Sequence, residues 1–219
     1  QNSEVPSISS PARLRLAYDE LLANQLALSL VRGHMKRAAG RSFAGDGTRQ
    51  AKIIGALPYK LTGGQAFANA EIHADMTSPS RMLRLLQGDV GSGKTIVALL
   101  ALATAVECGA QGTFMVPTEI LARQHLASLT PLCAAAGIAI AVLTGREKGK
   151  QREDILERLA AGRIDILIGT HALFQEGVEF RNLGLVVIDE QHRFGVHQRL
   201  ALQAKAGSAT DLLVMTATP

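Results

Sequence analysis

The sequence predicts an α/β fold with a mainly parallel β-sheet covered by helices on both faces. Short apolar runs alternate with longer segments of helical periodicity, which is typical of parallel strands joined by crossover helices. The run Leu185–Ile188 is apolar throughout, as expected for a strand buried on both faces. A chain of 219 residues can hold one large domain and a smaller appendage.

The first expected element is a long helix from about Pro11 to Ala38, because Ser10 and Pro11 suit a helix N-terminus. The segment Ala39–Thr48 is rich in Gly, Ser and charge, which indicates a flexible link. Residues 11–52 hold eight basic and three acidic side chains. We therefore assign residues 1–56 to a linker helix with a flexible basic segment, and residues 57–219 to the main domain.

Helices and strands are expected to alternate in the main domain. The expected helices are Thr62–Asp75, Lys94–Cys108, Thr118–Ala136, Glu147–Ala161 and His197–Lys205. The expected strands are Met82–Leu86, Gly112–Val116, Ile138–Leu143, Ile164–Ile168, Leu185–Ile188 and Leu212–Met215.

The segment Gly88–Thr95 fits the P-loop pattern G-x-x-x-x-G-K-[ST] between an expected strand and an expected helix. Glycines let the backbone N–H groups turn toward phosphate oxygens, and the helix presents its positive end to the same anion. We expect Lys94 to reach the β- and γ-phosphates of ATP, and Thr95 to bind Mg²⁺. The expected nucleotide-binding residues here are Gly88, Asp89, Val90, Gly91, Ser92, Gly93, Lys94 and Thr95.

Two carboxylates follow the strand that ends at Ile188. Ligands of parallel sheets bind at the carboxyl ends of strands, so Asp189, Glu190 and the P-loop are expected to face one nucleotide. Asp189 is then a metal ligand, and Glu190 orients or deprotonates the attacking water; both join Lys94 as catalytic residues. A solvated turn is the alternative interpretation of this acidic pair.

Bulk properties narrow the class of protein. A net charge of +4 is compatible with a nucleic-acid partner. The longest apolar run, Ile96–Val106, is too short to span a bilayer, so no membrane partner is expected. There is no N-terminal signal pattern, and Cys108 and Cys133 are the only cysteines. A reduced, cytoplasmic protein is therefore expected.

Further segments resemble those of the superfamily 2 helicases, and within them the RecG family of branched-DNA translocases. The box Asp-Glu-Gln-His followed by Arg-Phe-Gly-Val points to this family. The matching segments besides the P-loop are Leu57–Gln65, Val116–His125, Leu143–Gly149, Gly169–Phe174, Asp189–Arg199 and Thr216–Pro219. The resemblance implies a RecA-like motor lobe that uses ATP and Mg²⁺.

The resemblance also implies roles for single residues. Tyr59 and Gln65 would lie near the adenine base, and His192 would be a catalytic residue that senses the γ-phosphate. The implied coupling residues are Arg193, Thr216 and Thr218. The implied DNA contacts are Thr118, Arg123, Gln124, Thr144, Gly145, Thr170 and His171.

Simpler structural roles stay open for several of these residues. Thr62 and Gln65 also fit a capping box, in which each side chain bonds the backbone of the other. Thr118 also fits a helix cap. Arg123 fits a solvated surface charge, and Tyr59 fits a core residue.

The expected function is that of the first motor lobe of a RecG-like ATP-dependent DNA helicase that remodels branched DNA, such as stalled forks and Holliday junctions, in recombination and repair. Its partners would be forked DNA, a second motor lobe and an N-terminal wedge domain of the same full-length chain. Because the second lobe would supply an arginine finger, this chain alone is expected to hydrolyse ATP weakly or not at all. A non-catalytic ATP- and DNA-binding module, or a P-loop ATPase with another substrate, remains an alternative.

Overall fold

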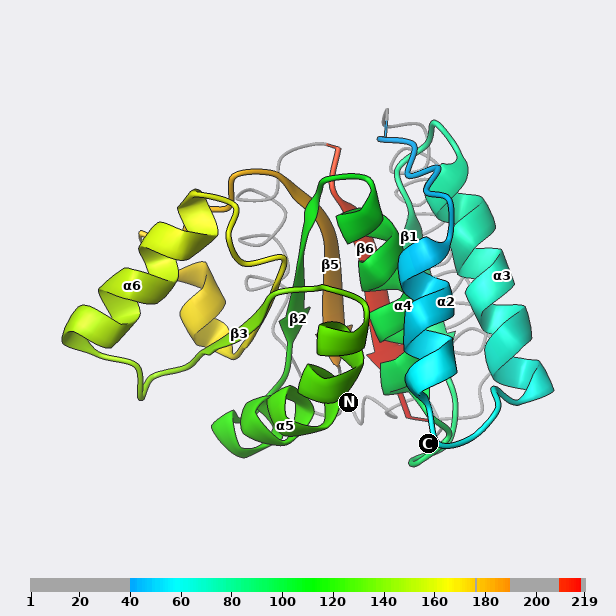
Figure 1. Cartoon of the computed structure of the whole chain (residues 1–219), viewed down its shortest axis with the longest axis horizontal. Helices are drawn as coiled ribbons and strands as arrows, with labels where there is room; N and C mark the ends of the chain where they lie inside the picture. The colour runs from blue at the N-terminus through cyan, green and yellow to red at the C-terminus, as the bar shows by residue number, and fades with distance from the viewer. Residues whose placement is uncertain (1–39, 176, 190–208, 218–219) are drawn as a thin grey trace, which may run out of the picture. The chain divides into compact units, whose positions relative to one another are not determined.

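The computed structural model describes residues 40–175, 177–189 and 209–217 (Figure 1). At its centre is a six-stranded sheet with the order β1-β6-β5-β2-β4-β3. Neighbouring strands are parallel in all five pairs. The predicted α/β class with a parallel sheet is therefore confirmed.

The expected elements that the structure describes lie within two residues of their expected bounds, whereas α2 and η1 were not expected. The strands are β1 (Leu83–Gln87), β2 (Gln111–Met115), β3 (Ile140–Leu143), β4 (Ile166–Gly169), β5 (Leu183–Asp189) and β6 (Asp211–Thr216). The helices are α2 (Thr48–Ala56), α3 (Gly63–Thr77), α4 (Lys94–Glu107), α5 (Glu119–Ala135), α6 (Gly149–Ala160) and the 3₁₀ helix η1 (His171–Phe174). The expected helices Pro11–Ala38 and His197–Lys205 lie outside the described residues. Within the described part of the chain, no helix has the length and apolar character needed to cross a bilayer.

Two hydrophobic cores lie on the two faces of the sheet. Helix α4 is the centre of the first core, with residues 96–106 all buried. Figure 1 shows α2, α3 and α4 together on the near side of the sheet. The second core includes Leu159 of α6. In β2, Phe114 belongs to the first core and Met115 to the second, because successive side chains point to opposite faces.

Residues 40–56 pack against the sheet as part of the main domain. The compact unit begins at Ala38, whereas the sequence placed its boundary at Leu57 with a flexible link upstream. Phe43 is 3% exposed and Ile53 is fully buried, and burial of such side chains contributes about 1.5–3 kcal/mol each. Residues 40–56 therefore pack with the main domain, and the position of the domain boundary stays a prediction.

A carboxylate from another helix holds the start of α2. Glu107, the last residue of α4, accepts hydrogen bonds from the backbone N–H groups of Gly47 and Arg49, both at 2.8 Å. The N-cap residue Gly47 has no side chain to make these bonds. Glu107 therefore satisfies amides that a helix start leaves unpaired, and its charge favours the positive end of the helix.

Asp211, the first residue of β6, carries a buried carboxyl group. One oxygen accepts a hydrogen bond from the backbone N–H of Met82 at 2.8 Å, and the other has no partner among the described residues. Burial raises the pKa of Asp211 to about 7, although the Met82 hydrogen bond and the charges of Arg81 and Arg41 oppose this rise. The folded chain therefore favours a protonated Asp211 in weakly acidic solution.

We predict that Asp211→Asn removes one component of the pH dependence of stability. The pKa rises from 3.8 to about 7 on folding, so the folded state holds one proton more between these values. The stability from this group is fully present below about pH 4 and is lost as the pH rises through about 7. In urea unfolding, the free energy of unfolding of the unsubstituted chain should fall relative to the variant by up to roughly 1.4 kcal/mol per pH unit in that window. Parallel stability curves for the two proteins would contradict this assignment.

Candidate nucleotide and nucleic-acid site

The P-loop forms a tight turn between β1 and α4. Gly91 and Gly93 have φ angles of 79° and 82°, in the left-handed region that glycine adopts without steric cost. The N–H of Ser92 donates to the carbonyl of Asp89 at 3.1 Å. Because α4 starts at Lys94, the first N–H groups of this helix have no intrahelical acceptor. The turn and the helix start together form a cradle suited to an anion.

Lys94 folds back onto this cradle. Its Nζ donates to the carbonyl oxygens of Gly88 and Asp89, at 2.6 and 2.7 Å. These contacts hold the ammonium group over the loop. A phosphate oxygen entering the cradle can exchange with a carbonyl and gain a charge-assisted hydrogen bond.

Gln65 joins the start of α3 to the P-loop. Thr62 and Gln65 form the capping box that the sequence allowed, with hydrogen bonds of 3.0 and 3.2 Å. In addition, Nε2 of Gln65 donates to the carbonyl of Ser92 at 2.8 Å. A Cβ at Gly93 would lie 2.3 Å from Nε2, so the glycine also makes room for this tether. The adenine contact of Gln65 stays a prediction.

The sheet places Asp189 at the same edge as the P-loop. Strand β6 lies between β1 and β5, so the ends of β1 and β5 are about 10 Å apart. Asp189 is opposite Met215 in the register, and the carbonyl of Thr216 accepts a hydrogen bond from the N–H of Gly88 at 3.3 Å. The expected metal ligand, the P-loop and the expected coupling residue therefore meet at one edge.

Four predicted site residues lie outside the described residues: Glu190, His192, Arg193 and Thr218. Their roles stay predictions.

Two hollows flank the start of α4. The smaller, of about 230 Å³, is lined by the P-loop and by Gln65. The larger, of about 610 Å³, lies between Tyr59, Thr95 and the α5 residues Gln124 and His125. Tyr59 is 50% exposed, so it is not a core residue and its ring is accessible to a base.

His125 in α5 is a residue for which the sequence predicts no role. Its ring centroid lies 5.0 Å from that of Phe114 in β2. Burial lowers the pKa of His125, and the negative charge of Asp189 opposes this shift, so the imidazole is an electrostatic neighbour of the expected metal ligand. His125 stands four residues from both Leu121 and Leu129, and this spacing could have placed it on the inner face of α5.

The predicted DNA contacts lie in the segments that follow β2, β3 and β4. Thr118 caps α5, because its Oγ1 accepts a hydrogen bond from the N–H of Leu121 at 3.3 Å. Thr144 and Thr170 are 0% and 2% exposed, so their hydroxyl groups are not accessible to a DNA strand in this arrangement. The exposed members of the set are Thr118, Arg123, Gln124, Gly145 and His171.

Arg123 is an exposed residue that is also ion-paired. Its guanidinium contacts the carboxylate of Glu147, a residue only 3% exposed, at 2.5 Å. The same carboxylate accepts hydrogen bonds from the N–H and Oγ1 of Thr144, at 2.6 and 2.8 Å. Burial raises the pKa of Glu147, but the hydrogen bonds from Thr144 and Arg123 outweigh it and lower the pKa below its ordinary value. Sequence reasoning missed Glu147, although the Thr-x-x-Glu spacing from Thr144 could have indicated that contact; the pair with Arg123, 24 residues away, has no local signal.

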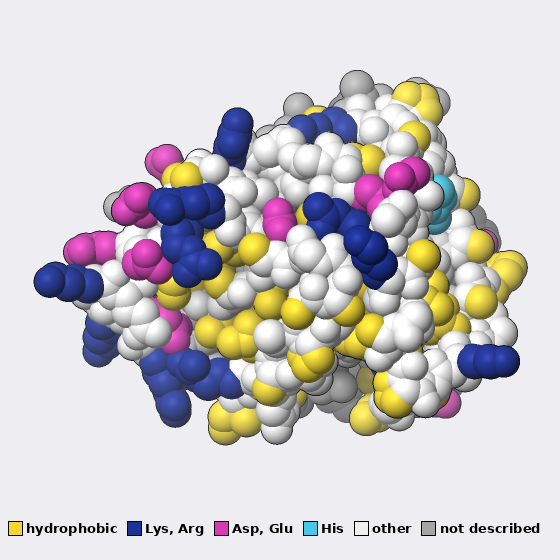
Figure 2. Space-filling model, viewed as in Figure 1, with side chains coloured by type: hydrophobic (Ala, Val, Ile, Leu, Met, Phe, Trp, Pro, Cys, Tyr) yellow, Lys and Arg dark blue, Asp and Glu magenta, His cyan; other side chains and the backbone are white. Residues whose placement is uncertain are grey.

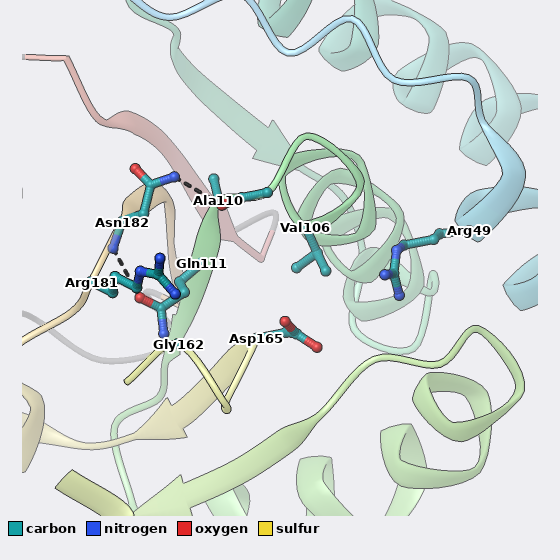
Figure 3. Close-up of a pocket in the computed structure, with 9 residues that line it drawn as sticks. Arg49, Val106, Ala110, Gln111, Gly162, Asp165, Arg181 and Asn182 are labelled. Carbon is teal, nitrogen blue, oxygen red and sulfur yellow. Dashed lines mark hydrogen bonds between the residues drawn. The ribbon is translucent and has the colours of Figure 1, made fainter. Parts of the chain in front are cut away.

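A third hollow, of about 560 Å³, lies at the opposite, amino-terminal edge of the sheet (Figure 3). Gln111 bridges three segments there: its Nε2 donates to the carbonyls of Leu159 and Ile164, and its Oε1 accepts from the N–H of Asn182. Arg49 donates to two carbonyls at the end of α5. These polar groups satisfy helix and strand ends, so we assign this hollow to structure.

A P-loop at the carboxyl edge of a parallel sheet, with an aspartate at the end of a nearby strand, defines a P-loop nucleotide-binding domain. The DEAD/DEAH box helicase family matches residues 64–219. The chain belongs to this family.

The chain is also similar to RecG proteins, which confirms the resemblance seen in its motifs. It is 52% identical to the ATP-dependent DNA helicase RecG of Bacillus subtilis over 95% of the chain, and 46% identical to that of Escherichia coli K12 over 100%. It spans 30% and 32% of these relatives. A structure of RecG bound to a three-way DNA junction matches 95% of the chain and 28% of its own length, with 47% identity and a TM-score of 0.82. The helicase MrfA bound to DNA and AMPPNP, 20% identical with a TM-score of 0.61 over 83% of the chain and 28% of its own length, shares the fold.

We predict that Gln65→Ala and Thr62→Ala separate the cap from the P-loop tether. Both substitutions remove part of the capping box and should destabilise the chain by about 0.5–2 kcal/mol. Only Gln65→Ala removes the hydrogen bond to Ser92, so only this variant should bind both ADP and GDP more weakly in calorimetric titrations. Equal nucleotide affinities in the two variants would show that the tether has no effect.

Proposed function

We propose that this chain is the ATP-binding motor lobe of a RecG-like ATP-dependent DNA helicase that remodels branched DNA. One observation carries the proposal: the P-loop, Asp189 and the loops after β2 and β3 share the carboxyl edge of one sheet, and Thr216 is hydrogen-bonded to Gly88. The same edge of the sheet can therefore bind a nucleotide and a DNA strand at the same time. Its similarity to RecG proteins, one of them bound to a three-way DNA junction, supports branched DNA as the substrate.

The P-loop cradle fits a nucleoside triphosphate. The N–H groups at the start of α4 would hold phosphate oxygens, and Lys94 would exchange its carbonyl contacts for the β- and γ-phosphates. The half-exposed ring of Tyr59 would face the base across the larger hollow. Gln65 would keep the loop in place through Ser92.

Thr95 and Asp189 are the residues that would hold Mg²⁺. Thr95 is in the first turn of α4, and Asp189 is 7% exposed at the end of β5. A bound Mg²⁺ would neutralise charge that builds up on the phosphates during transfer. Glu190, one residue further along, would orient or deprotonate the attacking water.

DNA would lie across the loops that follow β2 and β3, with a wedge domain supplied by the whole protein. Movement of the strand would follow from closure of a second motor lobe over the nucleotide. Such a lobe would supply an arginine finger, which is worth roughly 10³–10⁵ in rate. This chain alone should therefore bind ATP and hydrolyse it slowly, with little stimulation by DNA.

We predict that Lys94→Ala weakens nucleotide binding. The substitution removes the cation that would contact the β- and γ-phosphates, so the affinity for a fluorescent ATP analogue with Mg²⁺ should fall at least roughly tenfold. Fluorescence titration measures this change directly. Lys52→Ala is the matched control, because Lys52 is an exposed lysine of α2 and lies outside the P-loop. Equal affinities of the two variants would refute the proposed phosphate site.

A further inference from the structure

Two crossed ion pairs join the start of α5 to the loop after β3. Glu119 of α5 pairs with Arg146 of the loop at 3.0 Å, and Arg123 of α5 pairs with Glu147 of the loop at 2.5 Å. We call these four residues the carboxylate clasp. Both sides of the clasp come from segments that we expect to face a DNA strand.

The two acidic members of the clasp differ in accessibility. The side chain of Glu147 is 2% exposed, whereas that of Glu119 is 33% exposed. Arg146 is the more exposed of the two arginines, at 67% against 42% for Arg123. Glu147 and Arg123 therefore serve the internal structure, and Glu119 and Arg146 form the part of the clasp that solvent and ligands reach.

The partners of Glu119 are the donors that typically bind phosphate. One carboxylate oxygen accepts a hydrogen bond from the backbone N–H of Gly145 at 3.0 Å, and the other contacts Nε of Arg146. A backbone N–H beside a guanidinium is a common pair of donors to a nucleic-acid backbone. A Cβ at Gly145 would lie 3.0 Å from this carboxylate oxygen, so the glycine lets an anion approach closely.

The surroundings favour an anion of higher charge than one carboxylate. Figure 2 shows Lys and Arg side chains gathered at the lower left, where Figure 1 places the start of α5 and the turn from β3 to α6. The exposed residues there include Lys148, which precedes α6, and Lys150 in the first turn of α6. A strand that crossed this region would meet several cations beside the clasp.

We propose that the carboxylate of Glu119 occupies the place of a strand phosphate, and that a phosphodiester of single-stranded DNA displaces it to bind the N–H of Gly145 and the guanidinium of Arg146. This inference rests on the proposed function and names the residues of its strand-binding edge. Arg123 keeps its pair with Glu147, so Arg146 replaces it as the strand contact. Glu119 turns to solvent when the phosphate binds, and it weakens binding because it competes for the same donors.

Oligonucleotide affinity tests the exchange. Anisotropy titrations of a labelled oligo-dT at low salt compare the unsubstituted chain with Glu119→Gln and Arg146→Gln. Loss of the competing charge in Glu119→Gln should strengthen binding roughly three- to tenfold. Arg146→Gln should weaken binding by a similar factor and reduce the slope of log affinity against log salt by about 0.7, the value for one phosphate contact to a single strand.

A second exposed ion pair provides matched controls. Glu157 and Arg163 pair at 2.9 Å, away from the clasp, and Glu157→Gln and Arg163→Gln change the net charge by the same amounts. These variants should change affinity less than twofold if the effect is local. Equal changes in oligo-dT affinity at both pairs would show that only the net charge of the chain matters, and this result would overturn the proposal.

Two further measurements separate the possible failures. If the unsubstituted chain binds ADP but no oligo-dT, the inference and the strand-binding part of the proposed function both fail, while the nucleotide site stands. If it binds oligo-dT with affinity independent of Glu119 and Arg146, the inference alone fails. In a competition titration at constant ionic strength, inorganic phosphate is added at the same phosphate concentration as that of the oligo-dT. If it displaces the oligo-dT, the site binds free phosphate rather than a DNA strand, and the inference fails.

Discussion

The parallel pairing of the six strands is the constraint on which the rest of the structure depends. Because all neighbouring strands run in the same direction, every functional loop leaves the sheet at one edge. The position of β6 between β1 and β5 sets the separation of the P-loop from Asp189. The hydrogen bond from the N–H of Gly88 to the carbonyl of Thr216 then joins the first residue of the P-loop to the end of β6. The candidate site is thus a consequence of strand order, with side chains adding the chemistry.

Elements that depend on local pattern could be predicted from the sequence, and elements that depend on distant partners could not. The apolar runs and helical periods specified the described strands and helices α3 to α6 closely, because each buries a face that its own residues define. Helix α2 has only a weak local signal at its start, where Asp46 accepts a hydrogen bond from the N–H of Thr48 at 3.0 Å, and Glu107 supplies the other capping carboxylate from 58 and 60 residues away. The buried ring of Phe43 depends in the same way on Gly184 in β5. Both features were missed for one reason, which is that their stabilising partners come together only in the fold.

The same distinction applies within the candidate site. The P-loop is a contiguous motif, and the capping box of Thr62 and Gln65 needs only a spacing of three, so both followed from the sequence. The tether from Gln65 to Ser92 spans 27 residues and no pattern announces it. Arg123 was placed near a strand by resemblance, but the ion pair with a buried Glu147 gives it a structural function that its position in a motif does not show.

The donors of both anion-binding regions are paired with groups of the chain itself. Lys94 bonds carbonyls of its own loop, and Glu119 bonds the donors at Gly145 and Arg146. Such contacts pair donors that would otherwise lack a hydrogen-bond acceptor, and they keep these donors oriented for an incoming phosphate. They also favour ligands of high charge, because a weak anion gains little by displacing a carbonyl or a carboxylate, whereas a phosphate gains a charge-assisted bond. Selectivity for polyphosphate and for a nucleic-acid backbone would then depend on the internal hydrogen bonds that each site loses as well as on the contacts that it gains.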